Sequence, residues 1–468
     1  MSEQTLTVHA PYNGAVIGQV AVSTEADVEQ ALSVAHGIFR DRTQWLSKPQ
    51  RIEILQRAAE LIAARKVEIA TQAASEGGKP LKDSITEVER GIDGILNCIE
   101  VLRTEGGHVI PMGLNATSQN RVAFTQYEPI GVVAAVSAFN HPFNLIVHQV
   151  VPAIAVSAPV IVKPAANTPL SCRTLLHILA EAGLPTGWAQ MVLPTDNAVT
   201  GKLVADPRVG FFSFIGSAPV GWMLRSTLAP GTRCALEHGG VAPVIVAADA
   251  DLDDALPRIA RGGFWHAGQA CVSVQRIFCE RSIAEQVALR LGQLGDAMVV
   301  GDPTDIRTDV GPLISAREVH RVDQWVNEAV AGGARLISGG RVLDHNGYAP
   351  TVLLNPPIDS NVMQKEVFGP VVAVYAYDDL AEAIQLANAL PYAFQAAVFT
   401  RDLDTAMQCY QELDATAVMV NENTLFRVDW MPFAGARLSG HGVGGIPHTM
   451  KEMQIEKMMV WRSRAVRG

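Results

Sequence analysis

The chain has 468 residues, 48% of them hydrophobic, and a formal net charge of -10 at pH 7. Its length predicts two or three domains, and its acidic balance without any basic run argues against a nucleic-acid partner. The N-terminus lacks the pattern of a signal peptide and the longest apolar stretch, 150–162, is short and contains prolines, so we expect a soluble, cytoplasmic protein.

The N-terminal part of the chain is predicted to be helical. A first helix follows Thr24, with an acidic first turn and apolar residues at helical spacing. A second helix begins at Ser47 and ends at the sequence GGKP (77–80). A third helix is expected over 84–102.

Beyond residue 130 short apolar strands alternate with helices. This rhythm is typical of a parallel sheet with crossover helices, and we predict two α/β units with a cleft between them. The expected helices begin at 144, 171, 220 and 252, and the expected strands are 131–139, 158–164, 191–193, 209–216, 233–240, 242–246 and 274–280.

The cysteines and the standard catalytic patterns narrow the chemistry. There are 6 cysteines, scattered and without a C-x-x-C pair, which argues against a metal cluster or a disulfide framework and favours a reducing compartment. The patterns HExxH, GxSxG and GxxxxGK[ST] are missing from the sequence. We therefore expect no metal site, no α/β-hydrolase and no P-loop.

One cysteine has an unusual setting. In GQACVSVQR (268–276), Cys271 lies between a glycine turn and an apolar, strand-like run. An unpaired cysteine is most often a small buried hydrophobic residue, and a nucleophilic cysteine needs a special electrostatic environment. The segment by itself leaves both interpretations open.

The order of several short motifs decides between them. The motifs are AFNHPFN (138–144), IVKPAANTP (161–169), FIGSAPVG (214–221), EHGG (237–240), GQACVSVQR (268–276), KEVFGPV (365–371) and MPFAGARLSG (431–440). Together these motifs resemble the aldehyde dehydrogenase superfamily, in its non-acylating, NAD(P)-dependent form, over almost the whole chain. The resemblance implies a Rossmann-like dinucleotide-binding domain (1–109 and 130–239), an α/β catalytic domain (240–437) and a small β oligomerisation arm (110–129 and 453–468).

The resemblance implies the catalytic residues. Cys271 matches the nucleophile, whose thiolate adds to an aldehyde and, after hydride transfer to nicotinamide, forms a thioester that water cleaves. Asn140 matches the side chain that completes an oxyanion hole with the backbone N–H of Cys271, and Glu237 matches the general base. The alternatives are a turn-forming Asn140 and a solvated Glu237 at a strand end. His238 stands where the family usually has leucine, and it would alter the proton network if it faces the site.

The resemblance also implies a cofactor site for NAD or NADP. Glu366 resembles the carboxylate that holds the nicotinamide ribose, and Phe368 packs nearby in the family. Phe139 belongs to the same site through its motif. Gly216 and Ser217 occupy a strand-to-helix turn, where backbone amides and the helix dipole favour a pyrophosphate.

The adenosine end of that site bears on the choice of dinucleotide. Lys163 resembles the lysine that binds the adenosine ribose, although it could simply end a buried strand. NAD-preferring members commonly have glutamate three residues later, where this chain has Ala166. Because the missing carboxylate would bind ribose hydroxyls and repel a 2′-phosphate, we expect NADP to be used at least as well as NAD.

Three further residues match positions that line the substrate tunnel of the family. They are His148, Arg427 and Phe433. Polar groups there favour a short, hydroxylated or anionic aldehyde over a long alkyl or aromatic one. The alternative for Arg427 is an ion pair with Asp429.

The family builds an oligomerisation arm, for which 113–129 and 456–464 are the candidates. The second segment carries a row of apolar residues, and such a strand invites aggregation unless a partner chain covers it. We expect a homodimer or a homotetramer. Two other functions stay open: a CoA-acylating semialdehyde dehydrogenase, against which Glu237 argues, and a catalytically silent protein that keeps the dehydrogenase fold for binding.

Overall fold

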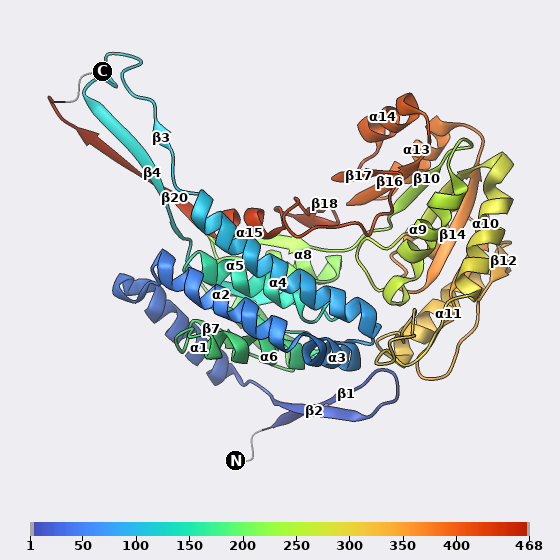
Figure 1. Ribbon diagram of the computed structural model, residues 1–468, viewed down its shortest axis with the longest axis horizontal. Helices are drawn as coiled ribbons and strands as arrows, with labels where there is room; N and C mark the ends of the chain where they lie inside the picture. Colours follow the sequence, from blue (N-terminus) through green and yellow to red (C-terminus); the bar gives the residue numbers. More distant parts are fainter. Residues whose placement is uncertain (1–3, 466–468) are drawn as a thin grey trace.

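The computed structural model describes residues 4–465. It has two large sheets with helices around them and a long β arm that projects from one end (Figure 1). The mixed α/β architecture agrees with the predicted fold class. The division into domains by residue range stays a prediction.

The first sheet has 6 strands and is parallel except at its short edge strand β19. Alternate residues of β5 enter different cores: Val133 and Ala135 pack on one face, and Ala134 and Val136 on the other. Both faces are therefore covered, which explains why the strand is apolar throughout. In spatial order the strands are β19 (Gly440–His441), β9 (Arg233–Glu237), β8 (Val209–Ile215), β5 (Val132–Val136), β6 (Val160–Lys163) and β7 (Ala189–Met191).

The second sheet has 7 strands and is parallel except at its edge strand β12. Its central strands are buried between helices on both sides, so it forms a core separate from that of the first sheet. In spatial order the strands are β12 (Arg335–Ser338), β13 (Thr351–Leu354), β14 (Val371–Tyr377), β11 (Arg276–Glu280), β10 (Pro243–Val246), β16 (Gln395–Phe399) and β17 (Ala417–Val420).

The helices divide between the two sheets, and the last one along the chain returns to the first sheet. Those that surround the first sheet are α1 (Glu25–Arg40), α2 (Lys48–Ala64), α3 (Lys66–Gly77), α4 (Leu81–Thr104), α5 (Asn144–Ala155), α6 (Pro169–Glu181), α7 (Asn197–Ala205), α8 (Ala218–Arg225) and α15 (Ile446–Glu452). The others are α9 (Leu252–Phe264), α10 (Arg281–Asp296), α11 (Ala316–Ala331), α12 (Asn361–Gln364), α13 (Leu380–Asn388) and α14 (Leu403–Glu412).

Two expectations for the N-terminal part were wrong. The helix expected from Ser47 to the GGKP turn is two helices, α2 and α3, and no glycine or proline marks their junction at Arg65. The chain also begins with an antiparallel hairpin of β1 (Thr5–His9) and β2 (Val16–Ala21), not with helix. Its signal was present in the sequence: alternating apolar residues and a turn at Gly14, whose φ of 71° favours glycine.

The arm is a 3-stranded antiparallel sheet of β3 (Val109–Ile110), β4 (Arg121–Pro129) and β20 (Gln454–Arg462). It extends away from the body of the molecule in Figure 1. β20 lies at its edge, and Met458 and Trp461 are each 57% exposed. The predicted range of the arm ends with 466–468, which lie outside the described residues.

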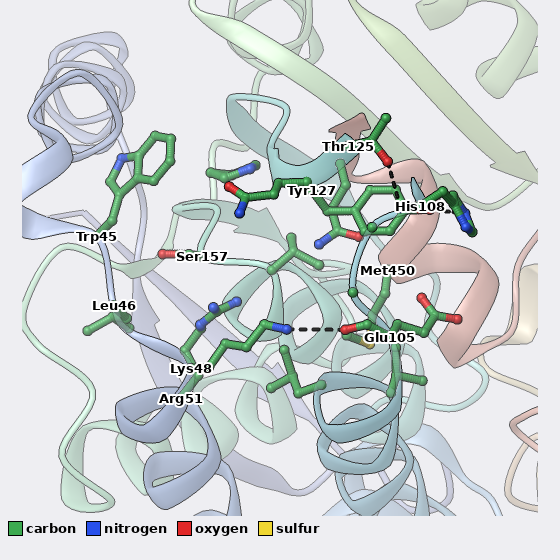
Figure 2. Close-up of a pocket in the computed structure, with 18 of the residues that line it drawn as sticks. Trp45, Leu46, Lys48, Arg51, Glu105, His108, Thr125, Tyr127, Ser157 and Met450 are labelled. Carbon is green, nitrogen blue, oxygen red and sulfur yellow. Dashed lines mark hydrogen bonds between the residues drawn. The ribbon is translucent and has the colours of Figure 1, made fainter. Parts of the chain in front are cut away.

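A pocket of about 600 Å³ lies where the arm meets the body (Figure 2). The Lys48 ammonium donates a hydrogen bond across it to the Glu105 carbonyl, at 3.1 Å, and the backbone N–H of His108 donates to the Thr125 hydroxyl. Sequence patterns gave no signal for this pocket. None of the predicted catalytic residues lines it.

Within residues 4–465, no helix has both the length and the apolar character needed to cross a membrane. Over the same residues, no group of histidine, cysteine and acidic side chains is arranged to hold a metal ion.

Candidate active site

Cys271 lies in the connection between α9 and β11. The connection begins with a tight turn in which His266 and Ala267 have φ values of 49° and 52°, and Gly268 follows at 70°. A side chain at Gly268 would collide with the Gly369 carbonyl, so the turn requires glycine there. Cys271 itself is partly exposed and packs against a small cluster of Val272, Phe394 and Phe433.

Asn140 reaches this loop from the first sheet. It follows β5, is 5% exposed, and donates a hydrogen bond from Nδ2 to the Gln269 carbonyl at 2.9 Å. An amide group has two N–H bonds, so the second one stays available for a negatively charged oxygen near Cys271. The structure thus brings two of the predicted catalytic residues to one place from distant parts of the chain.

Gln269 is a supporting residue that sequence reasoning missed. It is buried, and its Nε2 donates to the carbonyls of His266 and Pro312 while its Oε1 accepts from the backbone N–H of Ile314. These bonds fix the backbone on which the Asn140 amide depends. The only signal was its place in the GQAC motif.

Glu237 ends β9, and its side chain approaches the backbone of Gly444, where a Cβ atom would meet the carboxylate. Burial raises the pKa of Glu237, and the Arg427 guanidinium partly offsets this effect. Burial also raises the pKa of the Cys271 thiol to about 12, with Glu366 and Glu237 raising it and Arg427 lowering it. The predicted nucleophile, the predicted base and Arg427 therefore share one electrostatic environment.

Glu366 is the other carboxylate that acts on the Cys271 thiol. Its Oε1 is buried without a hydrogen-bond partner among the described residues, and burial raises its pKa to about 8. A Cβ atom at Gly239 would meet the carboxylate, so glycine is needed there. Two residues after Glu366, the ring of Phe368 meets that of Phe139 edge to face, with centroids 5.8 Å apart. A buried acceptor without a donor fits a group that brings hydroxyls, such as a ribose.

The remaining predicted cofactor residues line the carboxyl edge of the first sheet. Gly216 and Ser217 form the turn from β8 into α8, and the Gly216 N–H donates to the Glu237 carbonyl at 3.1 Å. Lys163 ends β6, and burial lowers its pKa. Ala166 is exposed in the loop that follows. Dinucleotides bind at this edge of parallel sheets, with the pyrophosphate at a helix N-terminus, so the residues fit that cofactor.

Comparison with known proteins agrees with this geometry. The model of the aldehyde dehydrogenase family matches residues 1–459. The chain belongs to the aldehyde dehydrogenase family. It is 38% identical to a 3-sulfolactaldehyde dehydrogenase of Priestia aryabhattai, over 94% of this chain and 92% of that protein.

Solved structures of the same family superimpose closely. The glyceraldehyde-3-phosphate dehydrogenase GapN of Methanocaldococcus jannaschii, complexed with NADP, is 32% identical with a TM-score of 0.93, covering 98% of this chain and 99% of that one. Aldehyde dehydrogenase 21 of Physcomitrella patens, in complex with succinate, is also 32% identical, with a TM-score of 0.94 and coverage of 99% and 96%. The predicted family, fold class and enzyme class, an aldehyde dehydrogenase, are confirmed.

In this member of the family, the charge of an arginine acts on Cys271. The Arg427 guanidinium lies 3.6 Å from the centroid of the Phe433 ring, and its Nη2 is 3.5 Å from Nδ1 of His148. The alternative ion pair with Asp429 is not formed, because Arg90 and His148 occupy the oxygens of that carboxylate. The roles of His148, Arg427 and Phe433 toward a substrate stay predictions.

His238, the departure from the family pattern, lies among aromatic rings. Its ring meets those of Phe214 and Trp222 edge to face, and its Nδ1 is 2.9 Å from the Leu438 carbonyl. Its Nε2 points at Gly221 of α8, where no side chain could fit. Its ring therefore packs against α8, the helix that follows Gly216 and Ser217.

Proposed function

We propose that this protein oxidises an aldehyde to the carboxylic acid, with NAD(P)+ as oxidant, through a covalent thiohemiacetal and thioester on Cys271. The observation that carries the proposal is the convergence on one cysteine loop of the Asn140 amide, the buried Glu237 carboxylate and the Arg427 guanidinium. These groups supply the oxyanion donor, the base and a charge that stabilises a thiolate.

The chain's own groups account for the main demands of the reaction. Asn140 Nδ2 and the backbone N–H of Cys271 bind the oxygen that becomes negative when the thiolate adds to the carbonyl, and one such donor contributes roughly 3 kcal/mol. The nicotinamide supplies the hydride acceptor when it is bound. Glu237, whose pKa burial raises, takes the proton of the thiol and later that of the water that attacks the thioester.

The cofactor prediction, NAD or NADP, is confirmed by solved relatives that are complexed with NADP or described as NAD-dependent. We assign the nicotinamide ribose to Glu366, the pyrophosphate to the turn at Gly216 and Ser217, and the adenosine ribose to Lys163. Use of NADP at least comparable with that of NAD is proposed from Ala166, whose small side chain leaves room for a 2′-phosphate and repels no charge.

For the substrate we propose a short polar or anionic aldehyde. Arg427 places a positive charge near the thiol, where Val272, Phe394 and Phe433 form an apolar cluster. Curated relatives are named for 3-sulfolactaldehyde, aspartate semialdehyde and lactaldehyde, all small polar aldehydes. Glu237 favours hydrolysis of the thioester over transfer to CoA, since transfer to a thiol needs no base to activate water.

A panel of aldehydes tests the proposal. Each aldehyde is assayed with NAD and with NADP, with and without CoA, by the absorbance of the reduced cofactor. We expect turnover without CoA, and a kcat/KM for small polar or anionic aldehydes at least tenfold above that for octanal or benzaldehyde. Turnover that depends on CoA would support the acylating alternative. No reduced cofactor with any aldehyde would support the silent one.

We also propose that β20 pairs with a second copy of the chain, to give a homodimer or homotetramer. Its free edge and exposed apolar side chains support this assembly. A monomeric mass by light scattering at micromolar concentration would rule it out.

A further inference from the structure

Arg427 is the last member of a row of polar contacts that begins on α4. The Arg90 guanidinium binds both carboxylate oxygens of Asp429, at 2.7 and 2.9 Å. His148 Nε2 lies 2.7 Å from Oδ1 of the same carboxylate, and His148 Nδ1 lies 3.5 Å from Arg427 Nη2. The side chains of His148 and Asp429 are only 5% and 1% exposed.

The protons of this row follow from its charges. Burial raises the pKa of Asp429, but the hydrogen bond from His148, the charge that His148 gains in acid and the charge of Arg90 outweigh it and hold that pKa well below the usual range. Burial lowers the pKa of His148, so the imidazole is neutral at pH 7. An ionised carboxylate only accepts hydrogen bonds, so the single imidazole proton is on Nε2 and the lone pair of Nδ1 faces the Arg427 guanidinium.

The same arrangement prevents a competing contact. A free carboxylate two residues from Arg427 would attract its guanidinium and neutralise it inside the protein. Arg90 and His148 satisfy Asp429 instead, and Arg427 stays over the Phe433 ring beside the thiol. With one acidic and two basic groups and a neutral imidazole, the row keeps one positive charge at its active-site end.

We propose that His148 is a positioning residue that, together with Arg90 and Asp429, holds Arg427 free and oriented for the anionic group of the substrate. The inference rests on the proposed function, because it assumes that Arg427 recognises an anion. It assigns the specificity of the site to a buried histidine that need not touch the substrate.

The test uses two aldehydes that differ only by a carboxylate, succinic semialdehyde and butanal. We expect His148→Leu to lower the ratio of kcat/KM for succinic semialdehyde over butanal by about tenfold, mainly through KM for the anion. His148→Gln should restore the ratio to within about threefold, since an amide can donate to Asp429 and accept from Arg427. Binding of succinate to each variant, measured by calorimetry, should follow the same order.

Arg427→Leu separates failure of this inference from failure of the proposed function. If Arg427→Leu abolishes the preference for the anion but His148→Leu leaves it intact, Arg427 acts without the row and the inference is wrong. If Arg427→Leu itself leaves the ratio unchanged, recognition of an anion is wrong as well. Equal loss of activity toward both aldehydes in His148→Leu and His148→Gln would reduce His148 to a structural role and overturn the inference.

Discussion

Three carboxylates belong to the candidate site or to its surroundings, and their pKa values move in opposite directions. Burial raises the pKa of Glu237, and it raises that of Glu366 to about 8. Asp429 is at least as well buried, yet its pKa is lowered. The difference lies in the partners: Arg90 and His148 bind both oxygens of Asp429, whereas Glu366 keeps an unpartnered oxygen.

The contrast separates groups that react or bind from groups that support them. A carboxylate with every oxygen bound is held in one charge state and one position, which suits a support. A buried carboxylate without partners is costly in the folded protein, and its raised pKa brings proton exchange close to neutral pH. Removing Glu237 or Glu366 should therefore affect activity, whereas removing Asp429 should affect stability.

The largest effect is expected for the nucleophile. Cys271→Ser should lower kcat by at least about a hundredfold, because a hydroxyl at its normal pKa is a much poorer nucleophile than a thiolate. NADP binding, followed by calorimetry, should stay close to wild type. Cys234→Ser, at a buried cysteine on β9, is the matched control and should remain active. More than about a tenth of wild-type kcat in Cys271→Ser would end the assignment.

The base should come next. Glu237→Gln keeps the shape of the side chain but cannot take a proton, so release of the acid should slow by about 10²-fold. Rapid mixing should then show one equivalent of reduced cofactor per active site, followed by slow turnover. Wild-type turnover without CoA would require another group as the base.

Removing the supporting carboxylate of Asp429 should lower the stability of the folded protein. Asp429→Asn removes the charge that Arg90 binds, and we expect a loss of about 3 kcal/mol in the free energy of unfolding, measured by urea denaturation. Glu237→Gln is the matched control at a carboxylate with a raised pKa. It should lower the free energy of unfolding much less, because the Glu237 carboxylate gains little from partners.

The pH dependence of the stability tests whether Asp429 is ionised in the folded protein. Because its folded pKa lies below the unfolded value of 3.8, its contribution is fully present at neutral pH and is lost as the pH falls through the folded pKa. The difference between wild type and Asp429→Asn should therefore shrink below about pH 4. A difference that grows on acidification would contradict the ionised state of Asp429.

The groups proposed to react and the groups that support them also differ in how far the sequence predicted them. Cys271, Asn140 and Glu237 stand in short motifs with fixed neighbours, and apolar strands such as β5 revealed the sheets. Asp429 binds Arg90 and His148, which lie on α4 and α5 far along the chain, and no local pattern marks such contacts. Gln269 was visible only as part of a motif. The break at Arg65 depends on packing, which periodicity does not encode.

The proposed adenosine end of the cofactor site differs from the carboxylate sites above, because Ala166 is exposed there. Ala166→Glu should raise KM for NADP and lower KM for NAD, by about tenfold in their ratio, since solvent weakens the added charge. Asn167→Glu, at the exposed neighbouring position, is the control and should change the ratio less. A wild-type enzyme that favours NAD by more than about tenfold in kcat/KM would refute the proposed role of Ala166.

The smallest and most discriminating effect concerns the thiol without cofactor. With a pKa of about 12, Cys271 is protonated at neutral pH, and its alkylation by iodoacetamide should accelerate with pH up to pH 9 without a plateau. Arg427→Leu removes the cation that lowers this pKa, so alkylation should slow by about threefold at each pH. Glu237→Gln removes a charge that raises this pKa, so alkylation should become faster. Arg317→Leu, at an exposed arginine of α11, should change nothing. A plateau below pH 9 would contradict the raised pKa of Cys271. A change in the same direction in Arg427→Leu and Glu237→Gln would show that these two charges do not shift that pKa in opposite directions.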